Sequence, residues 1–137
     1  MVDIDRTPGD VSTLDRVFVY GTLQVGGRYH HLAAPFVRGW TQGSAPGVLL
    51  NLGEYPGWVE GGGTVHGQVL RLQPIARALG IFDQLEDYLG PGHPDNLYQR
   101  VSVVVATPHG PVRAWGYRYV GPRSGHAVLP GGRWPPP

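Results

Sequence analysis

The chain has 137 residues, of which 41% are hydrophobic, and a formal net charge of +1 from 11 basic and 10 acidic side chains. This length suits one compact domain, and a charge so close to neutral argues against a nucleic-acid or membrane surface. The chain contains no cysteine, and all of its basic residues are arginine. A thiol nucleophile, a disulfide, a thiolate zinc site and lysine chemistry such as a Schiff base are therefore excluded.

The first 15 residues include four aspartates and no continuous apolar stretch. This composition predicts neither a signal peptide nor a transmembrane helix. We therefore expect a cytoplasmic protein with no membrane partner. Residues 1–14 show no hydrophobic period and are predicted to form a flexible leader.

The first regular element is predicted at residues 16–20, where β-branched and aromatic side chains are typical of a half-buried strand. Gly21 then permits a tight turn into Thr22 and Leu23. A turn directly after a strand leaves backbone N–H groups without partners, and such groups can bind a carboxylate or a carbonyl oxygen. The same pattern also fits an ordinary core strand followed by a turn, so both interpretations stay open for this segment alone.

Glycine and proline divide residues 24–72 into short elements. The pattern predicts a loop at 24–27, a short helix at 28–35, two short strands within 36–52, a loop at 53–58, a flexible hinge at 61–63 and a strand at 64–72. His30 and His31 point about 100° apart on a helix and have no third histidine at a ligand spacing. We therefore predict no metal site.

A longer helix is predicted at residues 74–88, beginning at Pro74. Its apolar stripe consists of Ile75, Leu79, Phe82 and Leu85. Glu86 projects only about 20° from this stripe, whereas Asp83 and Asp87 project about 80° and 120° away. Of the three carboxylates, Glu86 is the one predicted to face inward.

An inward carboxylate costs on the order of several kcal/mol unless it is paired or has a function. Three interpretations of Glu86 stay open from the residues alone. It forms a salt bridge with Arg100, or Gly80 breaks the helix and the projection fails, or Glu86 works as an acid or base.

Residues 98–107 and 112–120 are predicted to form a hairpin, joined through a Pro-His-Gly turn. Tyr98 and Arg100 share one face of its first strand. We expect this face to approach the site, with Arg100 as a structural partner for a carboxylate. Residues 122–137 are rich in glycine and proline and are predicted to form an extended, poorly packed tail.

Three segments together resemble the gamma-glutamylcyclotransferase-like family, in particular its branch related to gamma-glutamylamine cyclotransferase. They are Val17-Phe18-Val19-Tyr20-Gly21-Thr22-Leu23, Asp83-x-x-Glu86-x-Tyr88 and Leu97-Tyr98-Gln99-Arg100. The resemblance implies an α+β fold, with a small mixed β-barrel flanked by one main helix and short helices. We place this domain at residues 15–121, between the leader at 1–14 and the tail at 122–137.

The resemblance also implies an enzyme that releases an amine from a small gamma-glutamyl compound and forms 5-oxoproline. Glu86 would be the catalytic acid/base, and the substrate-binding residues would be Tyr20, Gly21, Thr22, Leu23, Tyr98 and Arg100. The substrate's own α-amine attacks its γ-carbonyl group, so this chemistry needs no protein nucleophile, metal or organic cofactor. A nucleic-acid partner is not expected.

The loop sequence leaves the leaving group open. The glutathione-related branch of the family commonly has Tyr-Gly-Ser-Asn where this chain has Tyr-Gly-Thr-Leu. A gamma-glutamylamine, a gamma-glutamyl peptide and a gamma-glutamyl acyl conjugate all remain candidate substrates. Two other hypotheses compete with the enzyme: a non-catalytic binding or sensing module for a glutamyl-like ligand, and a structural interaction domain. The sequence does not predict the oligomeric state.

Overall fold

A computed structural model describes residues 14–136. It contains one mixed six-stranded sheet with the strand order β4-β5-β1-β3-β2-β6. The strands are β1 (Arg16–Val19), β2 (Val37–Asn51), β3 (Pro56–Leu72), β4 (Tyr98–Val105), β5 (Val112–Tyr119) and β6 (Ala127–Val128). The helices are α1 (His30–Ala33) and α2 (Ile75–Leu85), with 3-10 turns η2 (Ala34–Phe36) and η3 (Pro130–Gly132). Apart from Leu14, the predicted leader lies outside the described residues.

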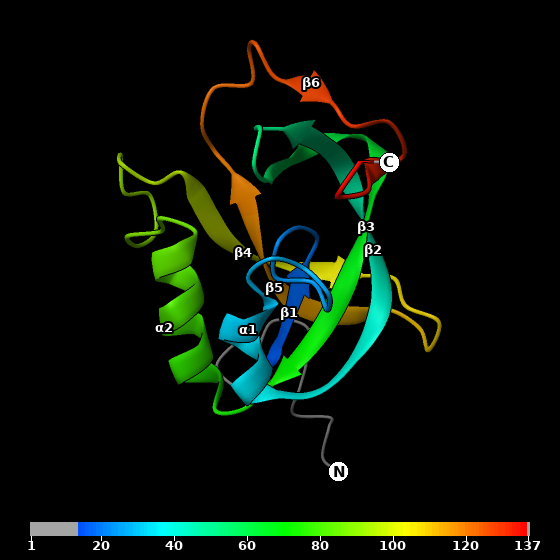
Figure 1. Cartoon of the computed structure of the whole chain (residues 1–137), viewed down its shortest axis with the longest axis vertical. Helices are drawn as coiled ribbons and strands as arrows, with labels where there is room; N and C mark the ends of the chain where they lie inside the picture. Colours follow the sequence, from blue (N-terminus) through cyan, green and yellow to red (C-terminus); the bar gives the residue numbers. More distant parts are fainter. Residues whose placement is uncertain (1–13, 137) are drawn as a thin grey trace.

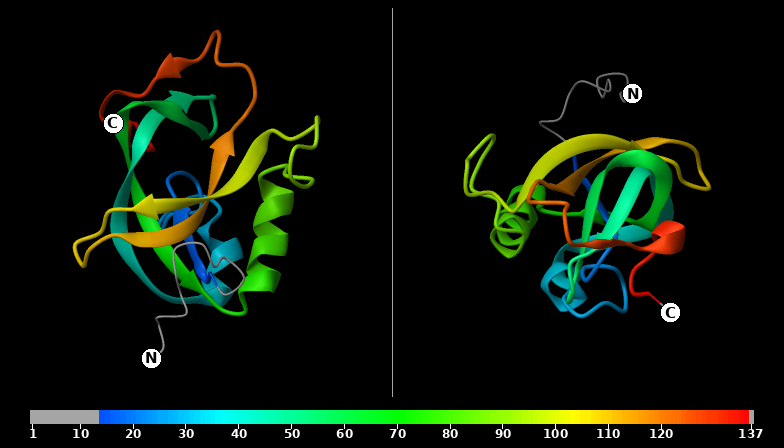
Figure 2. Two further views of the ribbon diagram at one scale, coloured as in Figure 1. Left: turned by 180° about the vertical axis from the view of Figure 1, so that it is seen from behind. Right: turned by 90° about the horizontal axis from the view of Figure 1, so that it is seen from above.

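The sheet curls until β4 returns to β2 (Figures 1 and 2). The main chains of Ser44 and Ala106 exchange two hydrogen bonds there, with N–O distances of 2.9 and 2.8 Å. Strand β1 runs antiparallel to β3 on one side and parallel to β5 on the other. This barrel-like sheet with its two helices confirms the predicted α+β fold.

The two faces of β1 enter different hydrophobic clusters, as its alternation predicted. Phe18 and Tyr20 pack edge-on against Trp58, with ring centroids 5.5 and 5.8 Å from that of Trp58. Val17 and Val19 lie in the other cluster, which also contains the buried face of α2. The exit of β1 is therefore held by core packing on both sides.

Helix α2 runs unbroken past Gly80, so the helix break considered from the sequence does not occur. Leu79 and Phe82 are buried, and Ile75 and Leu85 pack against the same cluster. These four residues are the predicted apolar stripe. The helix nevertheless ends at Leu85, three residues before the predicted end. Among the described residues, no helix is long and apolar enough to cross a membrane.

Strands β2 and β3 form one long antiparallel pair, so three predictions for this region are wrong. Residues 36–52 are not two short strands, the loop does not extend to residue 58, and residues 61–63 are not a hinge. Pro46 pairs with Thr64 and Val48 with Val59, so the glycine run lies at a shift in register. Gly61 lies in close contact with β2, because a Cβ at this position would lie 2.4 Å from Val48 Cγ2.

Most of the described tail is exposed, but the prediction of a poorly packed tail is wrong where the chain returns to β2 and the core. Val128 pairs with Leu50, and the buried Leu129 donates its N–H to Leu49 O at 2.7 Å. Trp134 packs against the cluster that contains Phe18. A few apolar side chains therefore hold this segment against the sheet, although its glycine and proline content predicted poor packing. The division of the chain at residues 15 and 121 stays a prediction.

Candidate active site

A cavity of about 230 Å³ opens between the exit of β1 and the carboxyl end of α2. Its walls bring together most of the predicted site residues, namely Tyr20, Gly21, Thr22, Leu23, Glu86 and Tyr98. Arg100 is not among the lining residues. The residues that line the cavity but were not predicted as site residues include Arg28, Glu54, Tyr55, Asp87 and Tyr117.

In the loop after β1, the carbonyl groups of residues 21–23 are hydrogen-bonded within the described part of the chain, whereas their amide N–H groups are not. The carbonyl oxygens of Gly21, Thr22 and Leu23 accept hydrogen bonds, respectively from Gln24 N at 3.2 Å, Tyr29 N at 2.8 Å and His30 Nδ1 at 2.9 Å. Within residues 14–136, the N–H groups of the same three residues donate to no other group. These donors are available to an anion or a polarised carbonyl oxygen.

Gly21 is required by close packing against Pro56. A Cβ at this position would lie 2.9 Å from both Pro56 Cδ and Pro56 Cγ. Pro56 is itself tied to the opposite wall, because Tyr98 donates its hydroxyl hydrogen to Pro56 O at 2.7 Å. The glycine turn predicted from the sequence is therefore present, and its packing fixes the loop against β3.

Glu86 directly follows α2, at the point where the chain leaves the helix. Asp87 adopts a left-handed conformation with φ 51°. The N–H groups of Asp87 and Tyr88 donate to Gln84 O at 3.3 Å and Asp83 O at 2.9 Å. These two bonds form a Schellman motif, which ends the helix and fixes the backbone that carries Glu86.

The Glu86 side chain is partly buried in the cavity wall. Its carboxylate forms no hydrogen bond or ion pair with any other described residue. Burial raises the pKa of Glu86 to about 7, and the neighbouring Asp87 carboxylate adds to the shift. A carboxyl group with such a pKa can both accept and donate a proton near neutral pH.

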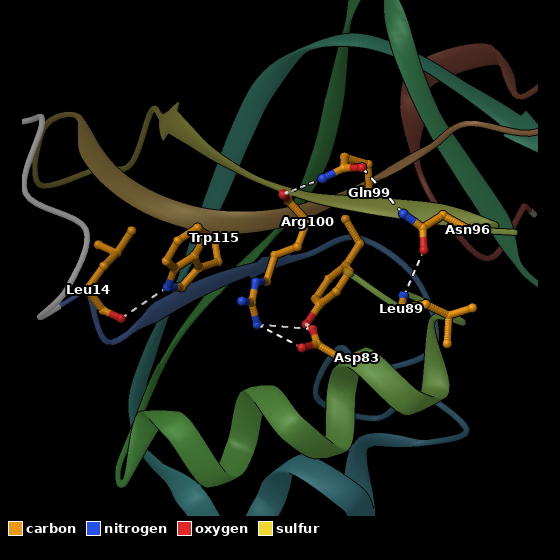
Figure 3. A network of polar contacts seen from close by, with 8 residues as sticks. Leu14, Asp83, Leu89, Asn96, Gln99, Arg100 and Trp115 are labelled. Atoms are coloured by element: carbon orange, nitrogen blue, oxygen red, sulfur yellow. Dashed lines mark hydrogen bonds and ion pairs between the residues drawn. The ribbon is translucent and has the colours of Figure 1, made fainter. Parts of the chain in front are cut away.

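Arg100 pairs with Asp83, not with Glu86. Its Nη1 lies 2.9 Å from Asp83 Oδ2 and 3.1 Å from Oδ1, and Figure 3 shows it reaching from β4 to α2. The guanidinium group also lies over the rings of Tyr88 and Trp115, with Cζ 5.4 and 5.0 Å from their centroids. The expectation that the Tyr98–Arg100 face approaches the site therefore holds for Tyr98 only.

Three of the tyrosines that line the cavity donate their hydroxyl hydrogen to an acceptor inside the protein. Tyr20 donates to Tyr117 O at 2.6 Å, Tyr98 to Pro56 O at 2.7 Å, and Tyr117 to Asp83 Oδ1 at 2.6 Å. Burial is the main cause that raises the pKa of all three, and the Glu86 carboxylate contributes to each shift. The tyrosines are therefore neutral at physiological pH.

The mouth of the cavity is charged and aromatic. Arg28 Nη1 and Glu54 Oε1 form an exposed ion pair at 3.0 Å, and Tyr55 is 41% exposed. The sequence did not predict these residues as part of the site, because they lie in loops, which have no periodic pattern. Tyr117 was also missed, because only the register of the hairpin, which the structure shows, places it opposite Arg100. In the described part of the chain, no group of three His, Asp or Glu residues is arranged to hold a metal ion.

Comparison with known proteins identifies relatives of the chain. Residues 17–136 match the family described as gamma-glutamyl cyclotransferase, AIG2-like. The chain is 35% identical over 121 residues to the gamma-glutamylcyclotransferase family protein ytfP of Citrobacter rodentium, covering 87% of this chain and 94% of the relative. It is 31% identical over 107 residues to the gamma-L-glutamyl-butirosin B gamma-glutamyl cyclotransferase of Niallia circulans, covering 77% and 67% of the two chains. Its fold is similar to that of an AIG2-like protein from Mus musculus, with a TM-score of 0.63, 22% identity and 78% of each chain covered.

Proposed function

The chain belongs to the gamma-glutamyl cyclotransferase, AIG2-like family and is an enzyme of this cyclotransferase type, and from this premise we propose its reaction. The enzyme releases an amine from a small γ-glutamyl compound and forms 5-oxoproline. One observation supports this proposal above all: the unpaired Glu86 carboxylate and the amide-bearing loop from Gly21 to Leu23 line the same cavity.

Glu86 is the general acid/base of the proposed reaction. The substrate's α-nitrogen forms a bond to its own γ-carbonyl carbon, and the bond from this carbon to the leaving nitrogen breaks. Two protons leave the α-ammonium group and two arrive at the leaving nitrogen, so the ring keeps one N–H and the amine departs as an ammonium ion. Glu86 transfers these protons in turn, and a pKa of about 7 suits both directions.

The loop after β1 binds the glutamyl group in this proposal. The free N–H groups of Gly21, Thr22 and Leu23 stabilise negative charge on the substrate, either on its carboxylate or on the γ-carbonyl oxygen. Tyr20 and Tyr98 shape the walls that fold the substrate into a reactive conformer. Arg100 acts through Asp83 and does not touch the substrate. The reaction needs no metal or organic cofactor.

The relative from Niallia circulans is named for a γ-glutamyl-butirosin substrate, and at 31% identity its leaving group is not assigned to this chain. The candidate leaving groups therefore stay those of a γ-glutamylamine, a γ-glutamyl peptide and a γ-glutamyl acyl conjugate. A cytoplasmic location also stays a prediction.

The test is a panel that contains one compound of each of these three classes. The purified protein is incubated with each compound, and 5-oxoproline and the free amine are measured by mass spectrometry. We expect equal amounts of both products from at least one class. If no class is turned over while 5-oxoproline binds in a calorimeter, the protein is the alternative binding module.

A further inference from the structure

We propose that Tyr117 is a positioning residue, which ties the glutamyl-binding loop to Glu86. This inference rests on the proposed function, because it concerns the same cavity. Tyr117 lies on β5 and lines the cavity between its two functional walls. Its main chain contacts one wall and its hydroxyl group contacts the other.

The contact to the loop wall is made through the main chain of Tyr117. Its carbonyl oxygen accepts the hydroxyl hydrogen of Tyr20 at 2.6 Å, in a buried bond between residues 97 positions apart. Tyr20 directly precedes Gly21, where the free amides begin. This bond therefore ties the loop to β5.

The contact to the helix wall is made through the side chain. The Tyr117 hydroxyl donates to Asp83 Oδ1 at 2.6 Å. Asp83 also accepts the Tyr88 N–H with its main-chain oxygen, in the motif that ends α2 around Glu86. One residue on α2 therefore receives the Tyr117 hydroxyl and holds the turn that carries Glu86.

Arg100 makes this connection rigid. It binds both oxygens of Asp83 (Figure 3). Its guanidinium group also lies over the rings of Tyr88 and Trp115. The side chains of Arg100 and Asp83 are each only 23% exposed, and their charges cancel. Asp83 is thus fixed in place without adding net charge beside Glu86.

The role of Tyr117 follows from the geometry that cyclisation needs. The loop holds the substrate and Glu86 moves its protons, so the distance between these two walls sets the rate. A displacement of about 1 Å can cost on the order of 10²-fold in rate. Without its hydroxyl group, Tyr117 still accepts the Tyr20 bond. Asp83 stays paired with Arg100 on β4 but loses its bond to β5, the strand that Tyr20 contacts. Binding then survives while proton transfer suffers.

The test compares Tyr117→Phe with Tyr119→Phe. Both substitutions remove one hydroxyl group from a buried tyrosine on β5, but Tyr119 donates to Pro122 O at 2.9 Å and does not line the cavity. kcat and KM are measured for 5-oxoproline release from the panel compound that the unmodified enzyme turns over. The melting temperature and the affinity for 5-oxoproline are measured on the same preparations.

For Tyr117→Phe we expect kcat to fall at least tenfold, while KM and the 5-oxoproline affinity change less than threefold. Tyr119→Phe should keep kcat within twofold at a comparable melting temperature. Asp83→Asn keeps an acceptor oxygen for Tyr117, so its kcat should lie above that of Tyr117→Phe. Equal kcat values for the two tyrosine variants, or a loss in KM alone, would overturn the inference and leave the proposed function intact. An unmodified protein that turns over no panel compound would overturn both.

Discussion

The carboxyl end of α2 has two carboxylates one turn apart, Asp83 and Glu86. One has hydrogen-bond partners within the protein and the other has none among the described residues. Asp83 accepts hydrogen bonds from Arg100 and Tyr117 on the neighbouring hairpin. Glu86 lines the cavity and, among the described residues, has no side-chain partner. The helix end thus presents a structural carboxylate to the sheet and an available one to the cavity.

The difference has an energetic meaning. A partly buried carboxylate with an arginine partner keeps its charge at little cost, whereas an unpaired one costs stability whenever it ionises. The raised pKa of Glu86 expresses this cost. Retaining such a group next to free amides favours a function over a structural role, because perturbed carboxylates cluster at functional sites.

The largest expected effect is on the rate. Glu86→Gln preserves the shape of the side chain but cannot accept a proton. We expect 5-oxoproline release to fall by about 10²- to 10⁴-fold, as is typical for a general acid/base, while 5-oxoproline affinity changes little. Steady-state kinetics and calorimetry on the purified variant measure both quantities.

Glu60→Gln is the matched control, because Glu60 lies outside the cavity and its side chain is 71% exposed. Its rate should equal that of the unmodified enzyme. If the rate of 5-oxoproline release fell by much less than tenfold in Glu86→Gln, the proton transfers would belong to another group. Glu86 and Asp83 would then no longer differ in function.

The direction of Glu86 was predictable because helix geometry fixes the angle between successive side chains. The projection holds until the backbone turns left-handed at Asp87, and Glu86 is the last residue before that point. The family motif pointed to the same residue. Its catalytic role stays a proposal, but its position beside the Gly21 turn agrees with the expectation.

Arg100 was expected to pair with a carboxylate and pairs with Asp83, but the hydrogen bonds of Tyr117 were not predictable in the same way. The Tyr117–Asp83 bond joins residues 34 positions apart, and the Tyr20–Tyr117 bond joins residues 97 apart. Both depend on β1 lying between β3 and β5, which no local pattern specifies. The glycines at 61–63 failed as a hinge for a similar reason, because β3 pairs with β2 on both sides of them, at Val59 and at Thr64.

The second prediction concerns the pH dependence of stability. Below pH 4.5, Glu86 is protonated in the folded and unfolded states. Between pH 4.5 and about 7 the unfolded state loses its proton first, so the stabilising contribution is lost as the pH rises through the folded-state pKa. Relative to Glu86→Gln, the unmodified protein should lose about 1–3 kcal/mol across this window. Urea unfolding of both proteins at pH 5 and pH 8 measures the difference.

Glu86→Gln should consequently gain in relative stability as the pH rises. A difference that does not change with pH would show that Glu86 ionises without cost in the folded protein. Its contrast with the paired Asp83 would then disappear.

The third prediction tests the paired carboxylate. Arg100→Ala leaves Asp83 partly buried without its cation, and breaking a buried pair is costly. Because both side chains are 23% exposed, we expect a loss of about 1–3 kcal/mol in the free energy of unfolding. Arg28→Ala is the comparison, since its ion pair is exposed and its loss should be much smaller. Lost activity at unchanged stability would instead make Arg100 a substrate ligand.

The smallest expected effect is that of Asp87→Asn, which removes the charge next to Glu86. Asparagine tolerates the left-handed conformation of Asp87, so stability should hardly change. The pKa of Glu86 should fall, because the Asp87 carboxylate is one of the causes that raise it. The acid limb of the kcat/KM profile should then move to lower pH. Since about half of the Glu86 groups are already ionised near pH 7, the rate there should rise by no more than about twofold. An unmoved acid limb would show that solvent screens Asp87, leaving burial as the cause that separates Glu86 from Asp83.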